Sequence, residues 1–457
     1  MTVRRIRRAA LLAALLGFPL ACKFEPRTPE LKYSLNRPVI AKNADLADNP
    51  AAQAQLQGAL EMMFGTPASP RILKLSDWDF DPNYWGEDLV MGDEGAKARL
   101  VESNRAAYRP QLEAIRAGDW AGVKQPRHAD DLWRWWLDLR ARLESEGPNA
   151  AGEEGTLRDD AVWLYENYYP TLANSATFYR NQCYHCHGSE GGGDGSTSAF
   201  LNPRPRDYRP GKFKFTALKG KARPRHEDLF RILSDGIYTT AMPSFRRFTD
   251  AQLHGLADYV RLLSMRGETE ILLAEFYDPD EGLNFDNVKE NFELVVGRWR
   301  EAGAQLISYG SEVPAVTGER IEHGRTLFMT PGEKGGANCV SCHGTSGRGD
   351  GASAFEIDPV TKLQRRVKDD WGNEIMVRDL TRDVFRFGRR PIDLYRRIYA
   401  GINGTPMPEH FGMTITENGQ QRTMNEDDIW DLVFFVRTLG AHAPQPAKPV
   451  EHGGEHK

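Results

Sequence analysis

Two short segments of the sequence have the residue types and the spacing to hold a redox cofactor. Each reads Cys-x-x-Cys-His, once from Cys183 to His187 and again, 156 residues later, from Cys339 to His343. Two thiols three residues apart lie on one helical turn, where both can bond the vinyl groups on one edge of a haem, and the adjacent histidine can bind the iron. We therefore expect two covalently bound haem c groups, attached by Cys183, Cys186, Cys339 and Cys342, with His187 and His343 as proximal iron ligands.

Two alternatives to haem attachment, a zinc site and a disulfide, explain fewer residues of each Cys-x-x-Cys-His motif. A zinc site takes four Cys or His ligands, but it does not require a histidine directly after the second cysteine. A disulfide within each Cys-x-x-Cys pair suits an exported protein, but it leaves both histidines without a role. Haem attachment explains the whole motif in both places, so it is the prediction that we carry forward.

A sixth iron ligand must come from elsewhere in the chain. Met242 lies 55 residues after His187, Met407 lies 64 residues after His343, and a proline follows each methionine. A single methionine usually fills a core, but a Met-Pro pair that returns at matched places favours axial ligation, which stabilises ferrous iron relative to two histidines. We expect Met242 and Met407 to be the distal ligands. His410 has no counterpart in the first copy and is expected to hydrogen-bond near Met407.

The two motifs belong to an internal repeat. Each is followed, in the same order, by Gly-Asp-Gly, Ser-Ala-Phe, Arg-Asp with two phenylalanines, Asp-Leu with an aromatic residue, and Met-Pro. The offset between the copies grows from 156 to 165 residues, which predicts a longer loop in the second copy between 359 and 377. Arg206 and Arg378 occupy matched places, where each could pair with a haem propionate or lie on the surface.

Helices must position these residues. Apolar residues at helical spacing predict an amphipathic helix at the end of each copy, over 253–263 and 429–439. Thr249 and Asn425 stand where the N-caps of these helices are expected. A further helix should include 324–328, before the second motif.

The N-terminal region, 22–150, is expected to be helical as well. Helices are predicted over 51–63 and 130–144. The second of these carries Trp133, Trp135 and Trp136, which we interpret as an apolar face packed on a neighbouring domain, a partner surface being the alternative.

Each copy of the repeat resembles a class I cytochrome c domain. The resemblance rests on a helix before Cys-x-x-Cys-His, a glycine-rich loop, a Met-Pro loop and a C-terminal helix, and it covers about 156–265 and 318–440. It implies a mainly α fold with two tandem haem domains and the ligands named above. The predicted organisation is an N-terminal region at 22–150, cytochrome c domains at 151–265 and 318–443, a helical connector at 266–317, and a mobile tail at 444–457.

The first residues have the pattern of an export signal. Four arginines precede an apolar run from Ala9 to Leu20, and Ala21 and Cys22 follow. We expect 1–21 to be a removed signal peptide and Cys22 to carry a lipid anchor, as in a bacterial lipoprotein, on the periplasmic side of a membrane. An exported soluble protein with an incidental cysteine is the alternative.

The composition restricts the class of protein. The chain has 457 residues, 40% of them hydrophobic and 27% charged, which is enough apolar material for roughly two to four domains. A net charge of −5 without a basic stripe argues against nucleic-acid binding. Beyond the first few dozen residues no apolar run is long enough to cross a bilayer, which excludes a polytopic membrane protein.

We expect an electron carrier rather than an enzyme, because two six-coordinate haems leave no position for a substrate. It would pass single electrons between membrane-associated partners of a bacterial respiratory chain, such as a quinol-oxidising complex and a terminal oxidase or dehydrogenase. Two alternatives stay open. One is a dihaem peroxidase-like enzyme, and the other is the cytochrome subunit of a dehydrogenase or reductase complex, with 22–150 docking the catalytic subunit.

Overall fold

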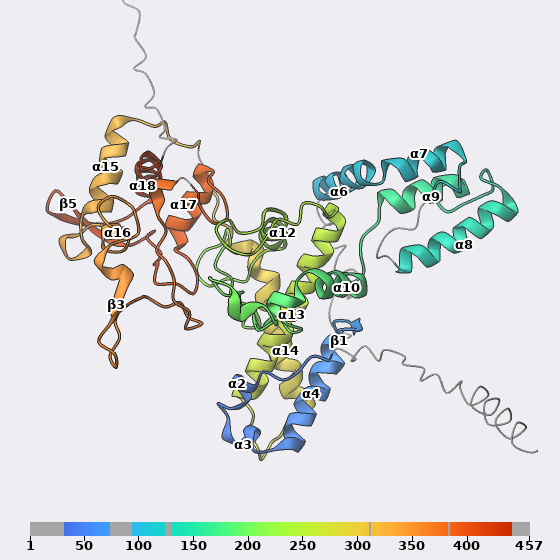
Figure 1. Ribbon diagram of the computed structural model, residues 1–457, viewed down its shortest axis with the longest axis horizontal. Helices are drawn as coiled ribbons and strands as arrows, with labels where there is room; N and C mark the ends of the chain where they lie inside the picture. The colour runs from blue at the N-terminus through green and yellow to red at the C-terminus, as the bar shows by residue number, and fades with distance from the viewer. Residues whose placement is uncertain (1–31, 74–93, 124–129, 310–311, 383, 441–457) are drawn as a thin grey trace, which may run out of the picture. The chain divides into compact units, whose positions relative to one another are not determined.

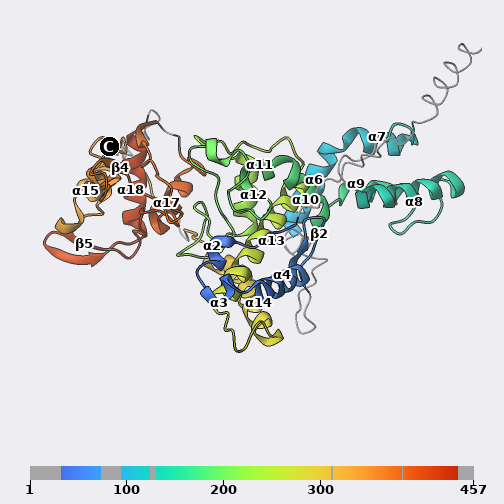
Figure 2. The same cartoon turned by 60° about the horizontal axis from the view of Figure 1, so that its bottom comes forward.

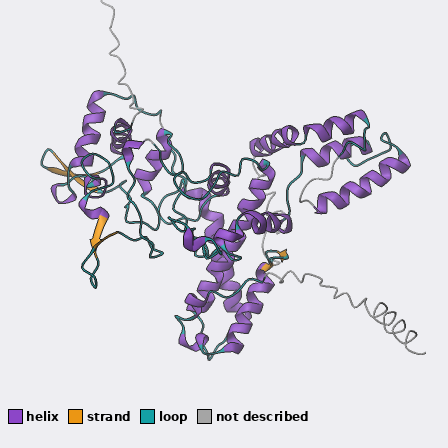
Figure 3. Cartoon of the chain, viewed as in Figure 1, coloured by secondary structure: helices purple, strands orange, loops and turns teal. Residues whose placement is uncertain are grey.

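The structure is a computed structural model that describes residues 32–73, 94–123, 130–309, 312–382 and 384–440. Helices dominate these residues, as predicted, and the strands are few and short (Figure 3). The predicted signal peptide, Cys22 and the tail 444–457 lie outside them. None of the described helices is both long and apolar enough to cross a membrane.

The first copy of the repeat is built around one long helix. The first motif lies on α11 (Tyr184–His187), directly after α10 (Leu172–Gln182). Helix α13 (Asp250–Glu275) packs against α10 and α12 (His226–Asp235), as Figures 1 and 2 show. As predicted, Thr249 caps α13, its side chain accepting the N–H of Gln252.

Helix α13 continues ten residues past the predicted boundary at 265, because its second half has its own partners. The segment α2 (Arg37–Ile40), α3 (Ala44–Ala47) and α4 (Pro50–Phe64) packs with it, as does α14 (Phe285–Arg300). The predicted helix over 51–63 is thus confirmed as α4. A short hairpin, β1 (Gly65–Thr66) with β2 (Ser69–Pro70), follows it.

Ion pairs are buried within this second half of α13. Arg266 Nη1 lies 3.1 Å from Glu270 Oε2, and both side chains are at most 1% exposed. Glu268 accepts from Trp299 Nε1 at 2.7 Å. A buried charge is tolerated only when it is paired and hydrogen-bonded. Arg266 also donates to the Ser34 carbonyl at 3.4 Å and Glu270 accepts the Asn36 N–H, so these side chains join α13 to the segment before α2, while Glu268 joins it to α14.

Four N-terminal helices share a separate core. They are α6 (Glu94–Ala107), α7 (Arg109–Ala117), α8 (Asp130–Glu146) and α9 (Leu157–Glu166). Trp136 of α8 is fully buried in it, together with residues of α9. The predicted helix over 130–144 is confirmed, and the side chains of Trp133 and Trp135 lie outside the description. The predicted boundary at 150 falls between α8 and α9, although both helices belong to this one core.

The second copy repeats the arrangement of the first. Helix α15 (Gly318–Met329) precedes α16 (Cys339–His343), and it packs against α18 (Glu426–Thr438), with α17 (Pro391–Ala400) on α18 as well. Asn425 caps α18 as predicted. This copy alone adds two hairpins among the described residues, β3 (Phe355–Ile357) with β4 (Gln364–Arg366) and β5 (Thr414–Glu417) with β6 (Gln420–Thr423). The short 3-10 helices are Ser198–Phe200, Glu301–Gln305, Gly332–Lys334, Ala352–Ala354 and Leu380–Arg382.

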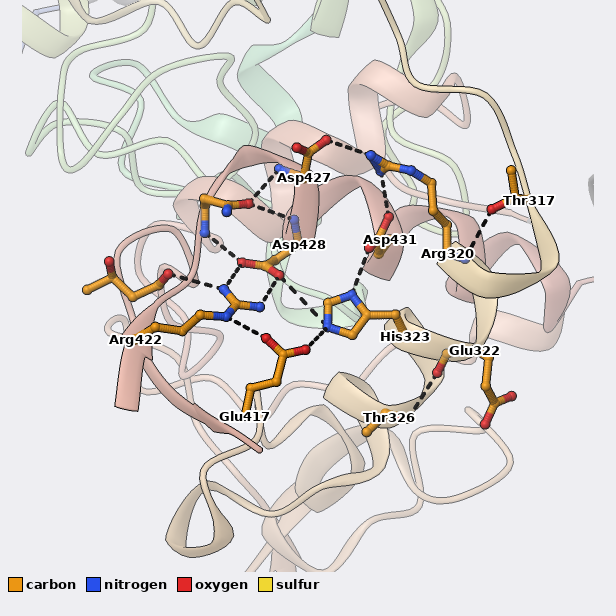
Figure 4. Close-up of polar contacts among 12 residues, drawn as sticks. Thr317, Arg320, Glu322, His323, Thr326, Glu417, Arg422, Asp427, Asp428 and Asp431 are labelled. Carbon is orange, nitrogen blue, oxygen red and sulfur yellow. Dashed lines mark hydrogen bonds and ion pairs between the residues drawn. The ribbon is translucent and has the colours of Figure 1, made fainter. Parts of the chain in front are cut away.

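A cluster of charged side chains joins α15 to α18 where the two helices cross (Figure 4). His323 of α15 places Nδ1 2.8 Å from Asp431 Oδ2 of α18 and Nε2 3.3 Å from Glu417 Oε1 of β5. Arg422 of β6 bonds Glu417 and, at 2.6 and 2.7 Å, Asp428. The hydrogen bond to Asp431 outweighs partial burial and raises the pKa of His323.

This raised pKa predicts a pH-dependent stability. Because the folded chain binds the His323 proton more tightly than the unfolded chain does, the contribution is complete below the ordinary histidine pKa and is lost as pH rises through the raised value. We expect the difference in the free energy of unfolding between the wild type and His323→Gln to shrink by about 1 kcal/mol over that range, because the histidines that titrate in both proteins cancel in this comparison. Urea titrations from pH 5.5 to 8.5 measure this. An undiminished pH slope in Asp431→Asn would contradict the assigned cause.

Candidate haem sites

The two cysteine motifs each form one helical turn, with the residues side by side as predicted. The N–H groups of Cys186 and His187 bond the carbonyl of Cys183 at 3.1 and 2.9 Å. Burial raises the pKa of Cys183, and likewise that of Cys339, to about 12. None of the four described cysteines is in a disulfide. In the described part of the chain no three Cys, His or acidic side chains are close enough together to hold a metal ion by themselves.

Both motif histidines are oriented by the same backbone contact. His187 Nδ1 lies 3.3 Å from the carbonyl oxygen of Arg206, and His343 Nδ1 lies 3.2 Å from that of Arg378. When Nδ1 donates to a carbonyl, Nε2 is left unprotonated and is free to bind a metal. Burial lowers the pKa of His187 to about 4 and lowers that of His343 as well, so both rings are neutral near pH 7.

The two methionine loops have the same hydrogen bonds. In the first, Thr240 Oγ1 donates to the Ile237 carbonyl at 2.7 Å and accepts the N–H of Met242 at 3.1 Å. In the second, Thr405 does the same with Ile402 and Met407, at 2.8 and 3.3 Å.

A glycine begins each of these loops in the left-handed region, Gly236 at φ 69° and Gly401 at φ 68°. A Cβ added to either glycine would meet the Met-Pro backbone at 2.5–2.6 Å. The chain can therefore fold back on itself in this way only at glycine.

The predicted ligands of the first copy line one cavity. It has a volume of about 910 Å³, and Cys183, Cys186, His187 and Met242 are all among its walls. Tyr208 and Phe213 add aromatic surface. A concave, mainly apolar space with a few convergent polar groups suits a flat hydrophobic cofactor, and these residues fit a haem. In the second copy Cys339 and Met407 pack against one hydrophobic cluster.

Family models match both copies. One, described as cytochrome C oxidase, cbb3-type, subunit III, matches 170–260. Another, described as cytochrome c, matches 321–440. The chain is a c-type cytochrome with two tandem cytochrome c domains. Electron transfer through covalently bound haem c is the chemistry of such domains. None of the curated proteins matches the cytochrome.

One solved structure resembles the cytochrome. It is a chain of the Kuenenia stuttgartiensis reducing HAO-like protein complex, 26% identical, and the similarity covers 60% of this chain and 97% of that one with a TM-score of 0.42.

The remaining candidate residues of the cytochrome have structural contacts. His410 is buried, and its Nδ1 lies 3.2 Å from the Ile398 carbonyl oxygen, so it hydrogen-bonds near Met407 as expected. His185 is exposed. His226 and His254 form a buried stacked pair with Nε2 and Nδ1 2.8 Å apart.

Sequence reasoning missed two aromatic residues of the sites. Tyr208 bonds Tyr179 through the hydroxyls at 2.6 Å, and its ring lies 5.4 Å from that of His187. Trp371 lies in the longer loop of the second copy and donates to the Asp207 carbonyl at 2.9 Å. The unexplained extra length of that loop was the signal that could have directed attention to Trp371.

Proposed function

We propose that the cytochrome is a dihaem relay that passes single electrons between redox partners. When bound, each haem iron carries one electron by cycling between its ferric and ferrous forms. His187 with Met242 would hold one iron, and His343 with Met407 would hold the other. The four motif cysteines would fix the macrocycles covalently.

The matched methionine loops are the observation that carries this proposal. Both copies use the same glycine, threonine and Met-Pro contacts, and both orient the proximal histidine through the same carbonyl. A peroxidase-like enzyme needs one iron position open to its substrate, so its two sites should differ. Two alike sites, each with a methionine loop of the same construction, support a carrier, because methionine ligation at both irons would leave little to rearrange when an electron arrives.

The experiment is a spectroscopic count of haems and of methionine ligands. Protein matured in a bacterial periplasm should keep two haems through denaturation, measured by intact mass. Met242→Ala and Met407→Ala should each remove about half of the methionine–iron charge-transfer band, and only the variants should bind carbon monoxide when reduced. A wild-type protein that binds carbon monoxide or turns over peroxide rapidly would overturn the carrier in favour of the enzyme.

We also propose that the cytochrome works at the periplasmic face of a bacterial membrane, between a quinol-oxidising complex and a terminal oxidase or dehydrogenase. The support is the signal-like sequence at 1–21 and Cys22 directly after it. Lipidation at Cys22 would keep the relay close to membrane-bound partners.

The anchor predicts the behaviour of one variant. Cys22→Ser should move the cytochrome from the membrane fraction to the soluble fraction, because it removes the atom that carries the lipid. Immunoblots of separated fractions measure this, with Cys22→Ser compared with the parent at equal haem content. Identical distribution of both proteins would mean that the chain is not anchored through Cys22.

A further inference from the structure

The two haem domains meet through the residues next to their proximal histidines. Arg206, whose carbonyl accepts from His187, extends its side chain into the second domain, where it stacks 3.6 Å above the Trp371 ring and lies 3.3 Å from Asp369 Oδ2. Its repeat counterpart Arg378 extends the other way and donates to Thr239 Oγ1 of the first domain at 3.3 Å. The contact is therefore reciprocal, with each domain sending an arginine into the other.

The cavity at this interface is strongly cationic. Nine Arg or Lys side chains from the two domains are among its walls, against three carboxylates, those of Asp350, Glu374 and Asp379. The cationic side chains of the walls thus outnumber the carboxylates. This is the same cavity that the predicted ligands of the first haem line. Such an excess favours an anionic ligand.

Two arginines of the second domain form no ion pair with any described carboxylate. Arg378 and Arg386 both reach Thr239 Oγ1, at 3.3 and 3.5 Å, and among the described residues no acid lies within ion-pair distance of either. The Nε of Arg378 is buried without a hydrogen-bond partner. Burial, followed by the charges of Arg378 and Arg206, lowers the pKa of Arg386. Partly buried guanidinium groups without an ion-pair partner favour a bound anion.

Thr239 adds an independent observation. It has φ 64°, a left-handed conformation that is rare for a β-branched residue and that marks functional sites when the surroundings maintain it. It lies three residues before Met242, on the loop that carries the expected distal ligand of the first haem. The two arginines therefore meet the first domain at the edge of its haem site.

We propose that Arg378 and Arg386 of the second domain bind the propionate carboxylates of the haem in the first domain. The proposal rests on the relay proposed above, since it requires a haem on the first motif. Planar guanidinium groups match carboxylates in geometry and charge. Docking of the second domain then determines the potential of the first haem, because two cations beside its propionates favour the ferrous form.

The test is redox titration of Arg386→Gln and Arg378→Gln as haem-loaded full-length protein. Each variant should make reduction of one haem about tenfold less favourable, which is 59 mV for a one-electron couple. Without its arginine a propionate should also titrate near neutral pH, so the potential of that haem should become pH-dependent. Arg386→Lys, which keeps the charge, should show a smaller decrease.

Lys212→Gln is the matched control. It removes one cation and one ion pair between the domains, that of Nζ with Asp370 at 2.6 Å, but Lys212 is not part of the cavity wall. Its potentials should equal those of the wild type. Potentials and pH profiles unchanged in Arg386→Gln and Arg378→Gln, with both haems attached and the methionine–iron band intact, would overturn the propionate site and leave the relay standing. An equal shift in Lys212→Gln would also overturn it, whereas failure of the wild type to bind haem would overturn the relay itself.

Discussion

Replacing Asp393 with asparagine should lower the free energy of unfolding by about 3 kcal/mol. Asp393 is 1% exposed, and its two carboxylate oxygens accept from Arg231 of the first domain at 2.6 and 2.8 Å. Arg390 binds the same carboxylate at 3.0 Å. Removing one partner of a buried pair leaves the others without a counter-charge, which costs more than the pair itself contributes.

The repeat supplies the control for this variant. Asp228 is the counterpart of Asp393 in the first copy, and both complete a capping box, on α12 and α17. Asp228 pairs with Arg225 of its own domain at 3.4 Å, and of these two described carboxylates only that of Asp393 has an ion pair across the domain interface. Asp228→Asn should therefore cost less than Asp393→Asn, and a double-mutant cycle with Arg231→Gln isolates the contribution of the Arg231–Asp393 pair. A coupling energy near zero between Arg231 and Asp393 would contradict the prediction.

The stabilisation that the Arg231–Asp393 ion pair contributes depends on pH. Burial alone would raise the pKa of Asp393, but the bonds from Arg231 and Arg390 hold it at about 2. Since the folded pKa lies below the ordinary value of about 4, the stabilisation is present above pH 4 and is lost as pH falls toward 2. The difference between wild type and Asp393→Asn should therefore shrink over that range.

The sequence singled out the expected haem-binding residues because their signals are local or repeated. The motif at Cys183, the Met-Pro pairs and the N-caps Thr249 and Asn425 depend on neighbours within a few residues, and the second copy doubled each signal. Periodicity likewise revealed the helices, because an apolar stripe shows which face is buried.

What the sequence could not reveal is which elements share a core. The charged segment 266–317 was expected to be a helical connector, yet its first residues continue α13, where Arg266 and Glu270 pair inside the protein. Similarly, α9 was assigned to the first haem domain although it packs with α6, α7 and α8. A charged residue is predicted to be solvent-exposed unless its partner in the fold is known. The hydrogen-bond partner of Arg378, Thr239, lies 139 residues away in the sequence.

Replacing Gly401 with alanine should open the second haem site without touching any expected ligand. Gly401 has φ 68°, and a Cβ there would lie 2.5 Å from the carbonyl oxygens of Met407 and Pro408. Real Cβ atoms do not approach backbone so closely, so the loop must move and take the Met407 thioether away from its place. We expect about half of the methionine–iron band to disappear, and the reduced protein to bind carbon monoxide at one haem.

Gly412→Ala separates this effect from backbone strain. Gly412 also has a positive φ, 76°, but nothing lies within 4 Å of its Cβ position. It should lose about 1 kcal/mol of stability and keep the full band. Gly236→Ala should remove the other half of the band, because its Cβ would lie 2.6 Å from the Pro243 carbonyl carbon. If Gly401→Ala retained the whole band while Gly412→Ala behaved as expected, the loop would not be what holds Met407 in place, and the assignment of that methionine as an iron ligand would fail with it.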